Sequence, residues 1–259
     1  MLDFNSTKII NGVYYLSENN TDIFDEDIYL QVRKQEGRLY TDSILKRLPL
    51  INKDHPLFEE WCVRKRSANK IAKYISNKKY NNLLEIGCGN GWLCNYISER
   101  CGCFAIGIDL NKFELEQAAR VFGKSEKVKF IYGNIYENIF PPALFEIIIF
   151  AASIQYFKNL NLIITSVLPL LKPKGEIHII DTYFYDKAEI ENAKNRSDNY
   201  YKNLGFPLMS KNYYHHSWDE LSYLEYDEIN FSNNNFIKVL KKLKISSNAK
   251  FPWIIFRSK

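Results

Sequence analysis

The chain has 259 residues, of which 46% are hydrophobic and 25% are charged. These proportions are ordinary for a globular protein of about one domain, and they exclude intrinsic disorder over most of the length. The formal net charge is +5, but the lysines are spread along the chain, so a dedicated nucleic-acid binder with one basic face is not favoured.

Cysteines and apolar segments indicate no metal site and no membrane span. Among the five cysteines, Cys94 and Cys101 lie on one predicted helix, about 10 Å apart along its axis, so one tetrahedral ion cannot easily reach both. The apolar stretch 144–154 is interrupted by Glu146 and is too short to cross a bilayer. The N-terminus shows no targeting pattern. We therefore expect a soluble cytoplasmic protein with reduced thiols, no bound metal and no membrane partner.

The sequence pattern changes near residue 82. The part before it predicts helices and loops, including a helix over about 58–75 with apolar residues on one stripe. After it, short apolar segments alternate with helical patterns, which predicts a parallel sheet covered by helices on both faces. The predicted strands span 83–86, 103–108, 128–132, 145–150, 176–180 and, at the end of the chain, 252–256.

A glycine-rich turn follows the first of these strands. Its residues, Gly87-Cys88-Gly89-Asn90-Gly91, allow the backbone to approach a ligand closely. A dinucleotide site would have its third glycine where this chain has Trp92, which disfavours a nicotinamide dehydrogenase. The next strand ends in Asp109, whose carboxylate can accept hydrogen bonds from ribose hydroxyls. Glu85 lies inside the first strand, where a carboxylate is costly unless it has a partner.

These features together resemble the class I S-adenosylmethionine-dependent methyltransferases. The resemblance covers about residues 60–185 and is carried by residues 85–91, Gly107-Ile108-Asp109, Gly133-Asn134, 145–150 and 170–176. It implies an α/β fold: a Rossmann-like, doubly wound, seven-stranded sheet with its last strand antiparallel. It also implies S-adenosylmethionine as the cofactor and a small-molecule acceptor. On this basis residues 1–80 are expected to form an N-terminal helical cap within the same domain, and residues 81–259 the donor-binding domain.

The resemblance also implies which residues bind the donor. Glu85 and the glycine turn would face the methionine part, Asp109 the ribose, and Asn134 with Ile135 the adenine, although the family often has Asp at the position of Asn134. Arg64 falls on the apolar stripe of helix 58–75, so it either covers the core with its stem or meets a ligand carboxylate. The donor-binding residues are expected to be Arg64, Glu85, Gly87, Cys88, Gly89, Gly91, Asp109, Leu110, Asn134, Ile135 and Ala151.

Segment 182–217 is expected to form a lid over the acceptor. It follows the strand that ends at residue 180, is rich in aromatic residues, and is too long for an ordinary connection. Its composition favours a flat or apolar acceptor. His215 and His216 within it are candidate catalytic bases or substrate hydrogen-bond donors, or else residues that only pack the loop. Tyr183 and Tyr214 are expected to contact the acceptor.

Two further tyrosines are candidate acceptor contacts. Tyr156 follows the fourth strand of the predicted sheet and either touches the substrate or closes the core. Gly37 suits a helix end, which leaves Arg38 and Tyr40 to cover the donor site or only the surface.

Other functions remain open from the sequence. After the fourth strand the chain has Ala151-Ala152-Ser153-Ile154, so the N-P-P-[YFW] motif that serves a planar amine acceptor is absent. Methylation of RNA, DNA or protein is the alternative among enzymes, with RNA or protein retained because this motif is absent, and a non-catalytic S-adenosylmethionine-binding partner subunit is a third possibility. The oligomeric state is not determined by the sequence.

Overall fold

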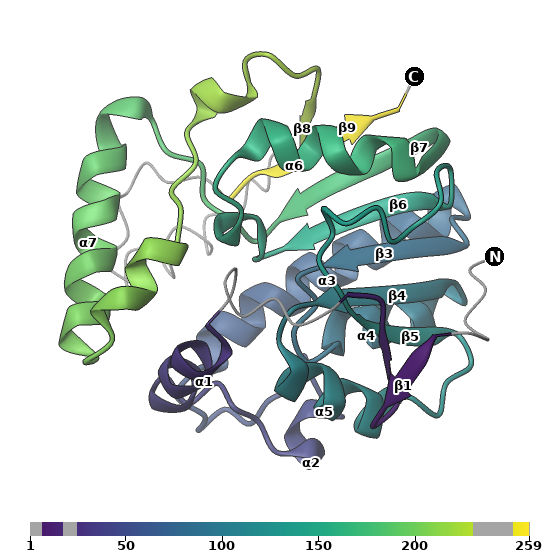
Figure 1. Ribbon diagram of the computed structural model, residues 1–259, viewed down its shortest axis with the longest axis horizontal. Helices are drawn as coiled ribbons and strands as arrows, with labels where there is room; N and C mark the ends of the chain where they lie inside the picture. The colour runs from purple at the N-terminus through teal and green to yellow at the C-terminus, as the bar shows by residue number, and fades with distance from the viewer. Residues whose placement is uncertain (1–6, 18–24, 230–250, 259) are drawn as a thin grey trace.

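A single sheet runs through the molecule, with helices on both faces (Figure 1). The computed structural model describes residues 7–17, 25–229 and 251–258, and in these ranges the sheet has nine strands. Their order is β1 (Lys8–Ile10), β2 (Val13–Tyr15), β5 (Val128–Tyr132), β4 (Phe104–Asp109), β3 (Asn82–Ile86), β6 (Phe145–Ala151), β7 (Leu171–Ile180), β9 (Trp253–Arg257) and β8 (Asp227–Ile229).

The seven strands from β5 to β8 in this order are the predicted Rossmann-like sheet. Strands β5, β4, β3, β6 and β7 are parallel, and β9 is antiparallel to both of its neighbours, β7 and β8. The predicted fold class is thereby confirmed, including the antiparallel last strand. Strand β8 had no counterpart among the predicted strands.

The sheet continues into the N-terminal region, where the sequence predicted only helices and loops. Strands β1 and β2 form an antiparallel hairpin, and β2 pairs in parallel with β5. Each strand has three residues, too few to show an alternating pattern. The turn between them is Asn11-Gly12, with both residues at positive φ. Asn-Gly is the strongest short-range hairpin signal, and it was overlooked.

Helices cover the two faces of the sheet unequally. The helices are α1 (Glu26–Gln35), α2 (Asp42–Leu45), α3 (Phe58–Lys78), α4 (Trp92–Cys101), α5 (Lys112–Phe122), α6 (Leu160–Val167) and α7 (Ile190–Asn203). Successive strand residues point to opposite faces, so Leu83 packs with α3, α4 and α5, whereas Leu84 packs with α6. In the described ranges, no helix is long and apolar enough to cross a membrane.

The carboxyl ends of the parallel strands meet at one edge of the sheet. There the chain adopts unusual backbone conformations: Ala152, after β6, has φ +53°, and Asp181, after β7, has φ +56°. Residues other than glycine seldom adopt positive φ, and such strain concentrates where a site is built. Ligands of open α/β sheets bind outside this same edge, so a ligand site is expected there.

Candidate active site

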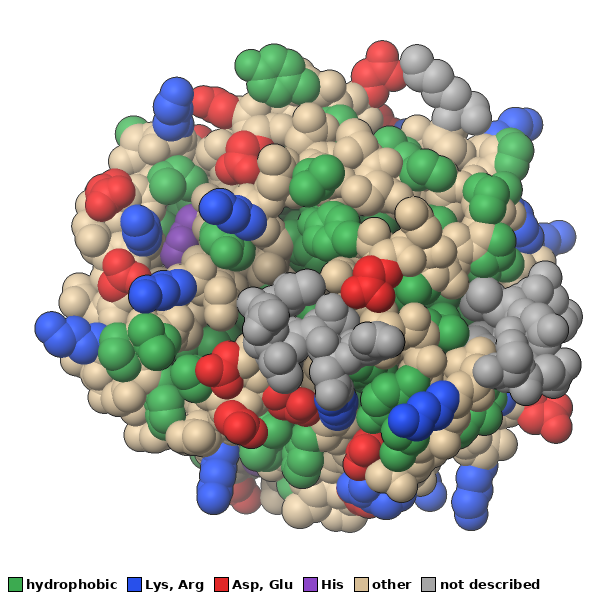
Figure 2. Space-filling view, in the orientation of Figure 1, with side chains coloured by type: hydrophobic (Ala, Val, Ile, Leu, Met, Phe, Trp, Pro, Cys, Tyr) green, Lys and Arg blue, Asp and Glu red, His purple; other side chains and the backbone are tan. Residues whose placement is uncertain are grey.

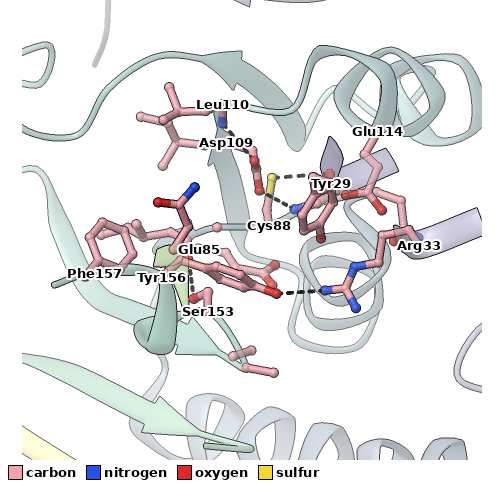
Figure 3. A pocket seen from close by; sticks show the side chains of 18 of the residues that line it. Tyr29, Arg33, Glu85, Cys88, Asp109, Leu110, Glu114, Ser153, Tyr156 and Phe157 are labelled. Atoms are coloured by element: carbon pink, nitrogen blue, oxygen red, sulfur yellow. Dashed lines mark hydrogen bonds between the residues drawn. The ribbon is translucent and has the colours of Figure 1, made fainter. Parts of the chain in front are cut away.

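A pocket of about 450 Å³ lies at the carboxyl ends of β3, β4, β5 and β6 (Figure 3). The glycine turn and the residues that follow β4, β5 and β6 line one part of it. Helix α1 lines another part, and so do residues of the short helical turn η4 (Pro207–Asn212). The pocket therefore joins the carboxyl edge of a parallel sheet to two segments far apart in the chain.

The glycine turn needs its glycines for packing as well as for conformation. A Cβ atom on Gly91 would collide with the ring of Phe130 in β5, and Gly91 adopts a φ of +71°. A Cβ atom on Gly87 would lie 2.5 Å from Cβ of Ser153. The turn is therefore packed closely against β5 and against the residues that follow β6, which requires glycine at both positions.

Asp109 fixes the end of β4 to the glycine turn. Its Oδ2 accepts a hydrogen bond from the backbone N–H of Gly89 (2.7 Å), and its Oδ1 accepts from those of Leu110 (2.7 Å) and Asn111 (2.9 Å). Burial raises the pKa of Asp109, and these three backbone donors counteract the rise. One lone-pair direction of Oδ2 is left for a ligand hydroxyl, which suits the expected ribose contact.

Glu85 presents a buried acceptor to the pocket. Its residue surface is 3% exposed, and among the described residues its Oε2 has no hydrogen-bond partner. Burial raises the pKa of Glu85 to about 8. An orphaned buried carboxyl is costly, and a cationic group of a ligand would satisfy it. The α-ammonium group of S-adenosylmethionine has the required charge, so the donor set fits this cofactor.

Arg64 lies in the pocket wall as part of a series of alternating charges. Its Nε donates to Oε1 of Glu60 (2.9 Å), which also accepts from Nη1 of Arg38 (2.6 Å). Arg38 contacts Glu36 through Nε (3.0 Å), and Glu36 pairs with Arg33 (3.1 Å). From the sequence, Arg64 was expected either to cover the core with its stem or to meet a ligand carboxylate, and neither alternative included this ion pair. Because Arg64 lies in the pocket wall, it can still contact a ligand carboxylate.

The pocket brings together ten of the eleven expected donor-binding residues. Asn134 and Ile135 line it after β5, and the backbone N–H of Asn134 is held by Oγ of Ser17 (2.8 Å). Its amide oxygen accepts from the N–H of Tyr136 (3.1 Å). Gly91 is the exception, since it lies beneath the turn against Phe130. The residues that line the pocket are Arg64, Glu85, Gly87, Cys88, Gly89, Asp109, Leu110, Asn134, Ile135 and Ala151.

Three of the four expected acceptor contacts also line the pocket: Tyr40, Tyr156 and Tyr214. Tyr183 does not. Its ring packs against Phe251, with 3.7 Å between the ring centroids, and against Tyr185. The aromatic composition of the segment therefore did not distinguish the rings that line the pocket from those that pack elsewhere.

The structure places neither candidate histidine in the pocket. His216 is buried, with Nε2 3.2 Å from the carbonyl of Ile154 and Nδ1 3.0 Å from Oε2 of Glu220. Because both ring nitrogens are engaged, it fastens the base of the lid. Nε2 of His215 lies 2.9 Å from Oγ of Ser197, and burial lowers its pKa to about 4. Neither is therefore positioned to accept a proton from a ligand in this pocket.

The sequence missed residues that α1 and α5 bring to the site. Tyr29 and Arg33 of α1 line the pocket, as does Glu114 of α5. The N-cap of α1, Asp25, accepts from the N–H of Ile28 and was a readable start signal. No local signal placed α1 against the glycine turn, because that contact depends on packing far along the chain.

Comparison with known proteins identifies the family. A family model described as a methyltransferase domain matches residues 77–229, more than half of the chain. A sterol 24-C-methyltransferase of Gibberella zeae is 25% identical over 139 residues, which cover 51% of this chain and 37% of that protein. The phosphoethanolamine N-methyltransferase of Plasmodium falciparum is 24% identical over 200 residues, which cover 70% of this chain and 74% of that protein.

Solved structures agree on the fold. A geranyl diphosphate methyltransferase in complex with S-adenosylmethionine matches with a TM-score of 0.57 and 13% identity, over 83% of this chain and 93% of that chain. The chain belongs to the methyltransferase-domain family and has the fold of class I S-adenosylmethionine-dependent methyltransferases. It spans little more than a third of the length of the sterol methyltransferases that it matches.

Replacement of Asp109 by alanine is expected to weaken donor binding. Hydrogen bonds to a charged group contribute about 1.5–3 kcal/mol, so affinity for S-adenosylhomocysteine should fall about tenfold or more. Titration calorimetry measures this, with Asp54→Ala as a control because Asp54 is exposed in a loop outside the pocket. A thermal melt confirms that the variant folds. Affinity within twofold of the wild type would mean that Asp109 does not bind the ribose.

Replacement of Glu85 by glutamine is expected to stabilise the ligand-free protein in a pH-dependent way. The pKa of Glu85 is raised from 4.5 to about 8. The wild-type carboxyl therefore lowers the free energy of unfolding progressively as the pH rises between these two values. The gain in melting temperature should therefore be larger at pH 8 than at pH 5. An equal gain at both values, or none, would show that the carboxyl is not buried as the structure has it.

Proposed function

We propose that this protein transfers the methyl group of S-adenosylmethionine to a small-molecule acceptor. The observation that carries the proposal is a single pocket in which donor-binding residues lie beneath a roof made by α1 and the lid segment 182–217. In this proposal the acceptor lies under the roof, beside the donor. A long polymer would need an open groove instead.

The two parts of the roof pack against each other. Val32 of α1 shares a small apolar cluster with Tyr201 and Met209 of the lid. The hydroxyl of Tyr200 donates to Oε1 of Glu36 (2.8 Å), which joins α7 to the end of α1. The lid is also tied to the sheet edge, where the N–H of Tyr214 donates to the carbonyl of Gln155 (2.7 Å). These contacts support the proposal that the roof encloses the acceptor and excludes water.

In this proposal the chain acts mainly by binding and orienting. Asp109 would hold the ribose, Glu85 the ammonium group, and Arg64 the carboxylate of the donor, while Asn134 and Ile135 would lie along the adenine. S-adenosylmethionine supplies the activated methyl group. Holding the nucleophile in line with it accounts for a large part of such a rate enhancement, since effective molarities of about 10⁵ M or more are reached by orientation alone.

Observations outside the pocket agree with a small acceptor. On the face seen in Figure 2, basic and acidic side chains are interspersed, and no extended basic groove of the kind that holds nucleic acid is visible. Two relatives are named for the small molecules that they methylate, a sterol and phosphoethanolamine. The acceptor of this chain is proposed to be a molecule of comparable size.

Binding of S-adenosylhomocysteine is the test of the proposal. At a hundredfold excess over its dissociation constant, it should stabilise the fold by about 2.7 kcal/mol, seen as a higher melting temperature. NADH is the control ligand and should have no effect. Turnover of S-adenosylmethionine with a panel of small molecules, RNA and protein then identifies the acceptor class. An unchanged melt with no heat in calorimetry would refute the proposal.

A further inference from the structure

Hydrogen-bond donors that lack acceptors gather where α1 and the lid meet over the pocket. They belong to Arg33 of α1, Tyr156 of the helical turn η1 (Ile154–Tyr156), and Lys211 and Tyr214 of the lid, all of which line the pocket. We refer to these four residues as the hydrogen-bonding cluster. The packing of Val32, Met209 and Tyr156 in one apolar cluster brings their elements together.

Arg33 has unused hydrogen-bonding capacity. Its Nη1 donates to Oε2 of Glu36 and its Nη2 to the hydroxyl of Tyr156, both at 3.1 Å. A guanidinium group has five N–H donors, so three have no acceptor among the described residues. The guanidinium lies 4.7 Å from the centre of the Tyr29 ring, and 22% of the side-chain surface is exposed. The group is thus held in place yet open to a ligand.

Tyr156 has an unused proton. Arg33 can only donate, so the phenol oxygen of Tyr156 is the acceptor in their hydrogen bond, and its own O–H is available for another. No described residue accepts it. Figure 3 shows Tyr156 and Arg33 reaching toward each other across the pocket from η1 and α1. This hydroxyl can therefore donate a hydrogen bond to an acceptor that a ligand supplies.

In the ion-pair series beside this hydrogen-bonding cluster, the cationic groups outnumber the carboxylates. The alternating series joins Arg33, Arg38 and Arg64 to two carboxylates, Glu36 and Glu60, which leaves one positive charge. Lys211 adds a second, since its ammonium group has no acidic partner in the described part of the chain.

Four carboxyls outside the series, those of Asp25, Glu85, Asp109 and Glu114, also line the pocket, and Asp109 and Glu114 interact with Arg33. Glu36 is saturated, because it already contacts Arg33, Arg38 and the hydroxyl of Tyr200. Glu114 reaches Arg33 from α5, but burial beside Asp109 raises the pKa of Glu114 to about 7, which weakens it as a counter-ion at neutral pH. What remains unused at this place are the hydrogen-bond donors of Arg33 and Tyr156, which a ligand oxyanion could accept.

We propose that the methyl acceptor carries an oxyanion, either a carboxylate or a phosphate, which is bound by Arg33, Tyr156 and Lys211. This inference rests on the proposed function, because it assumes that the acceptor occupies the pocket beside the donor. It deepens that function: the aromatic rings of Tyr29, Tyr156 and Tyr214 contact the body of the acceptor, and the cluster orients it through its charged end. Such a contact selects the acceptor rather than reacting with it.

In the experiment, the protein is first saturated with S-adenosylhomocysteine and is then titrated with matched probes. Benzoate and phenyl phosphate carry the two oxyanions on one aromatic body, and benzamide is the neutral match. One or both anions should bind at least about tenfold more tightly than benzamide, as expected for charged hydrogen bonds. Which anion binds more tightly distinguishes a carboxylate acceptor from a phosphate one.

Single substitutions test whether the hydrogen-bonding cluster causes this preference for anions. Arg33→Gln, Tyr156→Phe and Lys211→Gln should each weaken the preferred anion about tenfold, and Tyr156→Phe and Lys211→Gln should leave S-adenosylhomocysteine affinity within twofold. Lys202→Gln is the matched control, because Lys202 is exposed on α7 in the same lid but does not line the pocket. Should Arg33→Gln disturb the fold, the other two variants still test the site, since Tyr156 and Lys211 have no ion-pair partner among the described residues.

The outcomes separate this inference from the function on which it rests. Binding of S-adenosylhomocysteine without any preference for the anions, or an anion affinity that survives Tyr156→Phe and Lys211→Gln, overturns the oxyanion site and leaves the proposed function standing. Failure of S-adenosylhomocysteine to bind refutes both.

Discussion

The site depends on a carboxyl group enclosed in the central strand of the sheet. Glu85 pairs across the sheet with Gly107 of β4 and Ile149 of β6, and neither neighbour has a polar side chain to offer. A Cβ atom on Gly107 would lie 2.7 Å from Sγ of Cys88, so no larger residue could be placed there without displacing the glycine turn. The sheet thus retains an acceptor that costs stability, and its use is explained by a cationic ligand group.

The rest of the site consists of two regions of opposite polarity, one with hydrogen-bond acceptors and one with hydrogen-bond donors. Beside the glycine turn, Glu85 and Asp109 present acceptors to the pocket, which suits the ammonium group and the ribose hydroxyls of the donor. Under the roof, Arg33, Tyr156 and Lys211 present unused donors. The alternating series from Arg33 to Arg64 connects the two regions and stiffens the wall between them. One pocket can therefore orient two ligands with different charges.

The sequence predicted the parts of the structure that depend on local patterns. Strands 83–86 and 128–132, the glycine turn and Asp109 follow from apolar runs, turn residues and the rule that parallel strands end at one edge. It could not predict the roof, because α1 reaches the pocket by packing on Met209, far along the chain. The sequence could not decide between the two alternatives for His216 for the same reason: its ring nitrogens are engaged by Glu220 and by the carbonyl of Ile154, and only the folded chain brings the latter close.

The most direct test of this account is the proton balance of S-adenosylhomocysteine binding at pH 7, measured by calorimetry in buffers of different ionisation enthalpy. With its pKa raised to about 8, Glu85 is mainly protonated in the ligand-free protein, and an ammonium group beside it favours the carboxylate. The account predicts that the wild type releases up to about one proton more than Glu85→Gln does. Equal proton release by the two proteins, at similar affinity, would contradict it.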